Sequence, residues 1–200
     1  MRLTAIFLFF IISACQVSIN KDHVAEGTRL LSEGDYFNAD LEFDDALFID
    51  KTNLDALRGS YYCALYMNKY DRALERANSF IQLRPDSAVG YNDRGMLFMV
   101  TKDYQKAIAE FDKVIELNKG LQGIAYFNKA ESLRNLERYP EAVAAYNMVI
   151  AADSSDARAF YKKGAVFEKM GSMDSACASY RIAGDLGDQD ARKQRDILCK

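Results

Sequence analysis

The pattern of apolar positions along the chain repeats every 34 or 35 residues. Tyrosine stands at Tyr36, Tyr70, Tyr104 and Tyr139, at intervals of 34, 34 and 35 residues, and Met173 follows after another 34. An alanine comes three residues after each of these positions, at Ala39, Ala73, Ala107, Ala142 and Ala176. A period of this length predicts a solenoid, in which similar short units stack on one another.

Within each copy the apolar residues have the spacing of helices. Ala107, Ile108, Phe111, Val114 and Ile115 fall on one side of a helix, which predicts a buried stripe. An alanine at the crossing of two antiparallel helices lets their backbones approach closely. Two further columns recur. The first is mostly aromatic and contains Phe43, Ala77, Phe111, Tyr146 and Tyr180. The second is mostly small and contains Gly27, Tyr61, Gly95, Ala130 and Gly164.

These columns resemble the tetratricopeptide repeat, and the resemblance covers about residues 20–190. It implies an all-α, right-handed α-solenoid of five helix pairs. We expect the repeats at 20–53, 54–87, 88–122, 123–156 and 157–187, with one extra residue between Leu117 and the fourth repeat. A capping helix at 188–200 is expected to begin at the N-cap Asp188. It would turn Ala191, Ile197 and Leu198 inward and its basic residues outward.

The first residues form a separate, apolar segment. Ten apolar or small residues, 3–12, follow Arg2, and a helix of that length is too short to cross a membrane. The next residues, Ile12-Ser13-Ala14-Cys15, resemble the lipobox of bacterial lipoproteins. This resemblance implies a signal peptide at 1–14, palmitate or similar acyl chains on Cys15, and a tether at 15–19. The alternative is an ordinary signal peptide with an incidental cysteine.

Composition narrows the classes of function. The chain has 200 residues, 50% of them hydrophobic and two of them proline, and a net charge of -3, which disfavours nucleic-acid binding. His23 is the single histidine, and we expect it on the surface. The sequence contains no recognised catalytic or metal-binding motif, so we expect no enzymatic activity, no cofactor and no metal. The acidic run of Asp40, Glu42, Asp44 and Asp45 is interpreted as a solvated surface.

Three cysteines follow Cys15. Cys63 lies among apolar residues and is expected to be a small buried side chain. Cys177 and Cys199 lie ten residues before and twelve after Gly187, so an antiparallel hairpin of the last two helices would bring them together. Outside the cytoplasm they would form a disulfide, and two free core thiols are the alternative.

The resemblance also implies a binding groove lined by the first helix of each repeat, for a protein or peptide partner. Family members that clamp a carboxylate tail use lysine, asparagine and arginine in three successive repeats. Asn128, Arg158 and Lys162 match three of these places, whereas Asn92 and Met96 depart from the pattern. The expected groove residues are Arg58, Tyr62, Leu65, Tyr66, Asn92, Met96, Met99, Phe127, Asn128, Glu131, Arg158, Tyr161 and Lys162.

Charge is distributed unevenly along the array. Residues 20–53 carry a net charge of -6 and residues 157–200 a net charge of +3. This polarity could orient a partner or promote head-to-tail self-association, and the alternative is an array that makes no use of it. The first hypothesis is a lipid-anchored scaffold of the bacterial cell envelope, in the outer membrane if the cell is Gram-negative, because Gln16 is not aspartate. The second is a structural subunit of an envelope complex that uses its end and convex faces.

Overall fold

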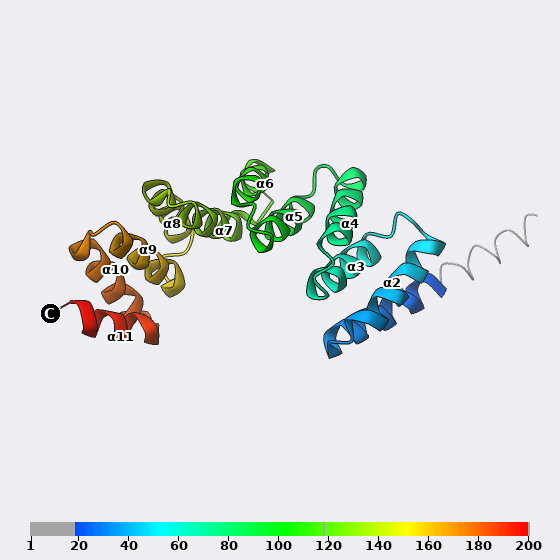
Figure 1. Cartoon of the computed structure of the whole chain (residues 1–200), viewed down its shortest axis with the longest axis horizontal. Coiled ribbons are helices and arrows are strands. Elements are labelled where there is room, and N and C mark those ends of the chain that lie inside the picture. Colours follow the sequence, from blue (N-terminus) through cyan, green and yellow to red (C-terminus); the bar gives the residue numbers. More distant parts are fainter. Residues whose placement is uncertain (1–18, 118, 200) are drawn as a thin grey trace, which may run out of the picture. The chain divides into compact units, whose positions relative to one another are not determined.

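The structure is a computed structural model, and it describes residues 19–117 and 119–199 (Figure 1). Cys15, the predicted signal peptide and most of the predicted tether lie outside the described residues. The chain divides into two compact units, residues 1–85 and 86–200.

The first unit contains two helix pairs. Residues 19–33 are helical and pair with α2 (Tyr36–Ile49), and α3 (Leu54–Tyr66) pairs with α4 (Tyr70–Leu83). The ring of Phe43 packs between the backbones of Gly27 and Gly59, where no larger residue would fit. Asn20 extends the contact by donating its side-chain amide to the carbonyl of Ala46 at 2.8 Å.

The second unit contains three helix pairs and a last helix. The pairs are α5 (Ala88–Val100) with α6 (Tyr104–Leu117), α7 (Gln122–Asn135) with α8 (Tyr139–Ala152), and α9 (Ala157–Lys169) with α10 (Met173–Asp185). The final helix, α11 (Gln189–Leu198), packs on α10. Throughout the described residues the regular secondary structure is helical, which confirms the predicted fold class of five helix pairs and a final helix.

The repeated columns form the core of both units. The five column alanines Ala39, Ala73, Ala107, Ala142 and Ala176 are fully buried. The aromatic column is buried as well, and in three repeats it packs against the glycine that lies 16 residues earlier, as Phe111 does against Gly95. The period therefore predicted the packing as well as the helices.

Three details of the structure bear on the expected ends of the array. The extra residue of the third copy does not lengthen the connection, because Gln122 is already the first residue of α7. Asp188 caps α11 as expected, by accepting a hydrogen bond from the backbone N–H of Ala191 at 2.8 Å. Ile197, however, does not point inward, since it is 65% exposed. Ile197 is six residues from Ala191 and therefore lies on another side of the helix. Leu198 is seven residues from Ala191, almost two full turns, and therefore lies on the same side as Ala191.

The acidic run of α2 is also different from the expected solvated surface. Asp40 is only 6% exposed and accepts a hydrogen bond from Ser60 at 2.8 Å. Arg72 Nη2 donates to Asp40 and Asp44, and Arg76 Nη2 donates to Asp44 at 2.8 Å. The network ties α2 to α3 and α4, because a buried carboxylate needs compensating donors.

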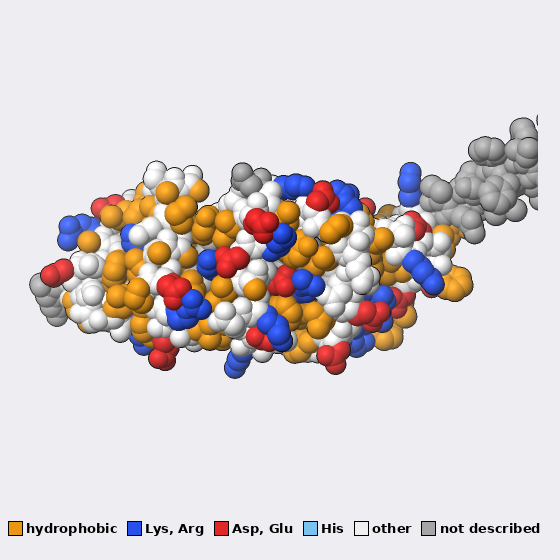
Figure 2. Space-filling model, turned by 90° about the horizontal axis from the view of Figure 1, so that it is seen from above, with side chains coloured by type: hydrophobic (Ala, Val, Ile, Leu, Met, Phe, Trp, Pro, Cys, Tyr) orange, Lys and Arg blue, Asp and Glu red, His pale blue; other side chains and the backbone are white. Residues whose placement is uncertain are grey.

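The remaining surface is of mixed charge. On the face shown in Figure 2, acidic and basic side chains lie next to one another between hydrophobic ones. Ion pairs such as Lys129 with Asp112 and Arg138 with Glu141 lie at the surface of the second unit, and exposed pairs contribute little to stability. No helix within the described ranges is both long enough and apolar enough to cross a membrane.

Candidate functional site

The predicted groove residues lie on the first helix of each pair. In the first unit, Arg58 and Tyr62 on α3 contact each other: the guanidinium donates to the tyrosine hydroxyl at 3.2 Å and its carbon lies 5.5 Å from the ring centre. Tyr66, one turn later, is exposed and stacks on Tyr36, with 4.7 Å between ring centres. These side chains present aromatic surface and a cation to solvent.

In the second unit, α5 contributes an asparagine with an unused acceptor. Asn92 is half-buried, and its amide nitrogen lies 3.5 Å from the sulfur of Met96. Its Oδ1 is buried and has no hydrogen-bond partner among the described residues. Met99 packs against the core cluster around Phe111, so it supports the helix more than it offers a binding surface.

Helix α7 contributes a second asparagine. The side chain of Asn128 is half-buried, and it makes no hydrogen bond within the part of the chain that the structure describes. Phe127, predicted as a groove residue, is only 9% exposed because it packs in the core beside Tyr146 and is covered by Arg158. The prediction that Phe127 offers its ring to a partner is therefore wrong.

Arg158 on α9 is the exposed cation of this surface. Its guanidinium lies 4.0 Å from the centre of the Phe127 ring, a cation–π contact that holds the side chain in place. The side chain is 64% exposed, and its nearest carboxylate, that of Asp156, is 4.0 Å away. Arg158 can therefore bind a carboxylate or a backbone carbonyl without breaking a strong ion pair.

A charged cluster that the sequence did not predict surrounds Glu131. Arg134 donates to its carboxylate at 3.0 Å, the hydroxyl of Tyr146 donates to it as well, and Lys162 Nζ lies 3.8 Å away. Burial opposes ionisation of Glu131, but these donors and the cations outweigh it and hold its pKa below the ordinary value. The carboxylate is ionised and partly neutralises Lys162.

This cluster bears on the predicted carboxylate clamp. Lys162 already faces Glu131, and Asn92 and Met96 supply no positive charge. Tyr161 is half-buried and packs toward Tyr180, with 5.7 Å between ring centres. In the second unit, the predicted groove residues thus offer one exposed cation, Arg158, and two asparagine amides, which suit an extended backbone better than a carboxylate end.

The single histidine and the free cysteine of the described residues both lie in the first unit. The side chain of His23 is 29% exposed, and its Nδ1 lies 2.7 Å from the carboxylate of Glu42. Burial raises the pKa of the Cys63 thiol to about 12, which keeps it protonated and unreactive. Within residues 19–117 and 119–199, no group of histidine, cysteine and carboxylate side chains could hold a metal ion.

The structure also places a disulfide between α10 and the end of α11. Cys177 and Cys199 are bonded, with 5.6 Å between their α-carbons. The bond fixes the last residues of the described chain to the preceding helix.

Two family models match the sequence. One, described as tetratricopeptide repeat, matches residues 64–121, and one described as TPR repeat matches residues 130–171. Among curated proteins, heat shock protein STI1 of Saccharomyces cerevisiae is 27% identical over 96 residues, 48% of this chain and 16% of that protein. Serine/threonine-protein phosphatase 5 of Rattus norvegicus is 27% identical over 119 residues, 58% of this chain and 22% of that protein. The chain therefore spans less than a quarter of either relative.

Solved structures show the same fold over most of the chain. MamA has a TM-score of 0.75 at 21% identity, covering 87% of this chain and 94% of MamA. PilW, a type IV pilus biogenesis factor, has a TM-score of 0.75 at 21% identity, covering 84% and 77%. YrrB, a TPR protein with an unusual peptide-binding site, has a TM-score of 0.70 at 19% identity, covering 88% and 91%.

Proposed function

Because the chain belongs to the tetratricopeptide repeat family, we propose that it is a non-enzymatic adaptor that binds an extended segment of a partner protein. The observation that carries the proposal is the half-buried Asn128, whose side-chain amide makes no hydrogen bond within the described residues. Asn92, one repeat earlier, adds an Oδ1 atom that is shielded from solvent but has no hydrogen-bond partner there. Such amides bond both the N–H and the C=O of an extended backbone. YrrB, which has the same fold and a peptide-binding site, supports this use of the scaffold.

The surroundings of these amides define the segment that fits. Arg158 provides one exposed cation, whose guanidinium lies over the ring of Phe127. Glu131 provides an anion that already forms an ion pair with Arg134. A segment with one acidic side chain and otherwise neutral residues is complementary to this arrangement. A tail with several carboxylates is less suitable, because Glu131 would repel it.

The binding proposal predicts that Asn128→Ala weakens partner binding by about 1–3 kcal/mol, as expected for an interface anchor. A photoreactive side chain at position 128 first identifies the partner by crosslinking in the native envelope, and titration calorimetry then compares the variants. Asn147→Ala on α8 is the matched control, since that asparagine contacts Lys163 and lies outside the proposed surface. Equal affinities of the Asn128→Ala variant and the unaltered protein would reject the proposed surface.

We further propose that Cys15 anchors the protein to a membrane of the bacterial envelope through its acyl chains, with the outer membrane favoured in a Gram-negative cell. The lipobox-like residues 12–15 after the apolar run support this, as does the likeness in fold to PilW, a pilus biogenesis factor. Two or three acyl chains are sufficient for stable anchoring.

The anchor proposal predicts that Cys15→Ser leaves the protein unprocessed or free of the membrane, because serine cannot carry the thioether-linked lipid. Membrane fractionation and intact mass measure both effects. Cys63→Ala is the control, since that cysteine is buried in the fold and should not affect localisation. An unchanged mass and an unchanged membrane fraction for Cys15→Ser would exclude the anchor.

A second candidate function is that of a structural subunit that assembles through other faces. The observation that favours it is the exposed apolar surface of α2, where Phe37, Leu41 and Phe48 are all at least half exposed. This function does not require the asparagine amides, so Asn128→Ala would leave assembly intact.

A further inference from the structure

The outer face of α2 is apolar although it is open to solvent. Phe37 is 60% exposed, Leu41 50% and Phe48 87%. They are separated by four and seven residues, so they lie along one side of the helix. We name this set the α2 stripe. Exposed large apolar side chains that gather on one face mark interaction sites more often than isolated ones do.

The other repeats provide an internal reference for this stripe. At the three equivalent positions, α4, α6, α8 and α10 carry only polar or small residues and one proline. They are Asp71, Gln105, Pro140 and Asp174, then Glu75, Ala109, Ala144 and Ala178, then Gln82, Glu116, Ala151 and Asp185. The fold therefore does not require apolar residues here, and the stripe is particular to α2.

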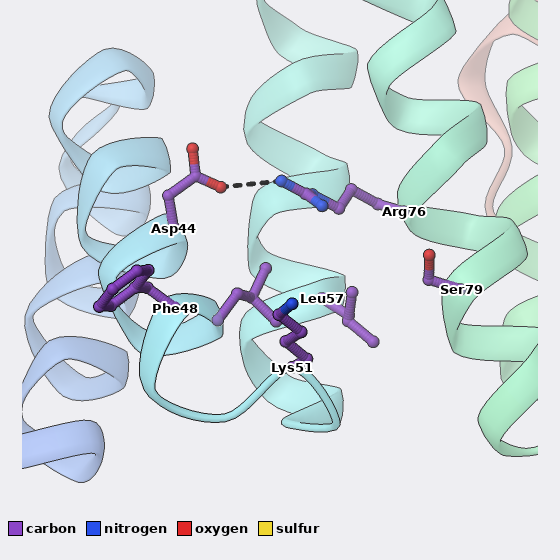
Figure 3. Close-up of a pocket in the computed structure, with 7 residues that line it drawn as sticks. Asp44, Phe48, Lys51, Leu57, Arg76 and Ser79 are labelled. Atoms are coloured by element: carbon purple, nitrogen blue, oxygen red, sulfur yellow. Dashed lines mark hydrogen bonds and ion pairs between the residues drawn. The ribbon is translucent and has the colours of Figure 1, made fainter. Parts of the chain in front are cut away.

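A cavity of ≈ 440 Å³ lies beside the stripe in the first unit. Its apolar lining comes from Leu47, Phe48 and Leu57, and Figure 3 shows Phe48 on α2 and Ser79 on α4 at opposite sides. Arg76 also lines it, but its guanidinium is bonded to Asp44 at 2.8 Å. The cavity is large enough to accept an aliphatic side chain of a partner.

Helix α2 makes the charge along the stripe negative, although Lys51, two residues after the helix, also lines the cavity. Helix α2 has four acidic and no basic side chains. Three of the acids have cationic or histidine partners, but Asp45, three residues before Phe48, is exposed and makes no ion pair or hydrogen bond within the described residues. A complementary partner is apolar and basic, and an anionic lipid surface would be repelled.

The last helix of the chain has this combination. Ile197 on α11 is 65% exposed, and Lys193, four residues earlier on the same side, has a side chain that is 75% exposed. Among the described residues, Lys193 forms an ion pair with Asp190 alone, at 3.4 Å, and both side chains are more than 70% exposed, so the pair is weak. Helix α11 carries three basic and two acidic side chains.

We propose that the protein self-associates head to tail, with α11 of one copy docked on the α2 stripe of a second copy. Ile197 enters the cavity beside Phe48, and Lys193 pairs with Asp45. The two surfaces are different, so each added copy leaves one of each open and the assembly can grow or close into a ring. The contact uses neither asparagine of the proposed peptide-binding surface and is independent of it.

The test is sedimentation velocity of the purified protein over a wide range of concentration. The unaltered protein should form larger species as its concentration rises. The triple variant Phe37→Asp, Leu41→Glu, Phe48→Gln gives α2 the residues of α4. Its dissociation constant should be at least about tenfold higher, so it should be monomeric at concentrations where the unaltered protein associates. Circular dichroism and melting should be unchanged because the three side chains are exposed. Met148→Gln on α8, at an exposed apolar position, is the control and should associate normally.

A charge exchange tests the partner helix. Asp45→Lys and Lys193→Asp should each weaken association, and the double variant should regain it. The proposal is overturned if the unaltered protein is monomeric at every concentration, if the triple variant associates normally, or if the double variant fails to recover. Loss of binding to neutral phospholipid vesicles by the triple variant, with both proteins monomeric, would instead assign the stripe to a membrane.

Discussion

At the scale of single residues, the fold depends on small side chains that face aromatic rings across a helix pair. A Cβ added to Gly95 would lie 2.8 Å from Cε1 of Phe111 and 3.2 Å from Cβ of Glu110. Overpacking at such a contact costs about 1–3 kcal/mol, and the gain in helix propensity is about 1 kcal/mol. We therefore expect Gly95→Ala to lower the free energy of unfolding by up to about 2 kcal/mol. Denaturant titration measures the change.

Gly123 provides the matched control for this substitution. It lies near the start of α7, and an added Cβ would meet no atom within 4 Å. Gly123→Ala should therefore be neutral or slightly stabilising. If Gly95→Ala proved as harmless as Gly123→Ala, the close glycine–aromatic contact would not be a determinant of stability.

Both columns are visible in the sequence because their members recur at fixed positions, and the structure shows that they pack against each other. In the second repeat the sizes are reversed, with Tyr61 on the first helix and Ala77 on the second, and both are buried. The sequence did not predict that Phe127 would be covered, because that depends on Arg158 from the following repeat. The burial of Asp40 was missed for the same reason, since its partners Arg72 and Ser60 lie on other helices.

At the scale of helices, the turn inside each pair has the same backbone conformation. Gly34, Asn68, Lys102, Glu137 and Gly171 occupy equivalent positions, and all five have positive φ, 59° at Glu137. A residue with a side chain is strained in this region, whereas glycine is not. We expect Glu137→Gly to raise the free energy of unfolding by up to about 1 kcal/mol, measured by denaturant titration.

Two comparisons check the origin of that effect. Lys102→Gly should behave in the same way, because its φ is 63°. Gly171→Ala should destabilise, since it introduces the strain that the other substitution removes. A destabilised Glu137→Gly variant would mean that the added freedom of the unfolded chain outweighs the relief of strain.

The helices themselves were predictable, because the apolar columns and the period fix where each one begins and ends. The extra residue before the fourth repeat was harder to place. The sequence assigned it to the connection, but α7 takes it up as an additional first residue, Gln122, because helix ends continue wherever capping and packing permit. The prediction that Ile197 faces inward was wrong. Helix α11 occurs once in the chain, so its positions cannot be compared with equivalent positions in other repeats.

At the scale of the whole molecule, the proposed function depends on exposed surfaces of the helix pairs. The family resemblance predicted the peptide-binding surface, and several of its residues are exposed or half-buried as required, including Asn128 and Arg158. The sequence could not predict that Glu131 would compete for Lys162, because that contact joins two repeats. The α2 stripe was also missed, although comparing each position across the five repeats would have revealed it.

The ends of a repeat array are held by neighbours on one side only, so the last helices are expected to open first. The bond between Cys177 and Cys199 closes a loop over a separation of 22 residues, which the chain-entropy model values at about 3 kcal/mol. Reductant should therefore increase amide hydrogen exchange in α10 and α11, while exchange in α2, α3 and α4 stays unchanged.

The control is the double variant Cys177→Ala, Cys199→Ala. Its α10 and α11 should exchange fast without reductant, and adding reductant should cause no further change. Cys63 should react with thiol reagents only after unfolding, because it is buried and its pKa is raised to about 12. A uniform response along the chain, or reaction of Cys177 and Cys199 with thiol reagents in unreduced, denatured protein, would show that the C-terminal helices are held by apolar packing instead.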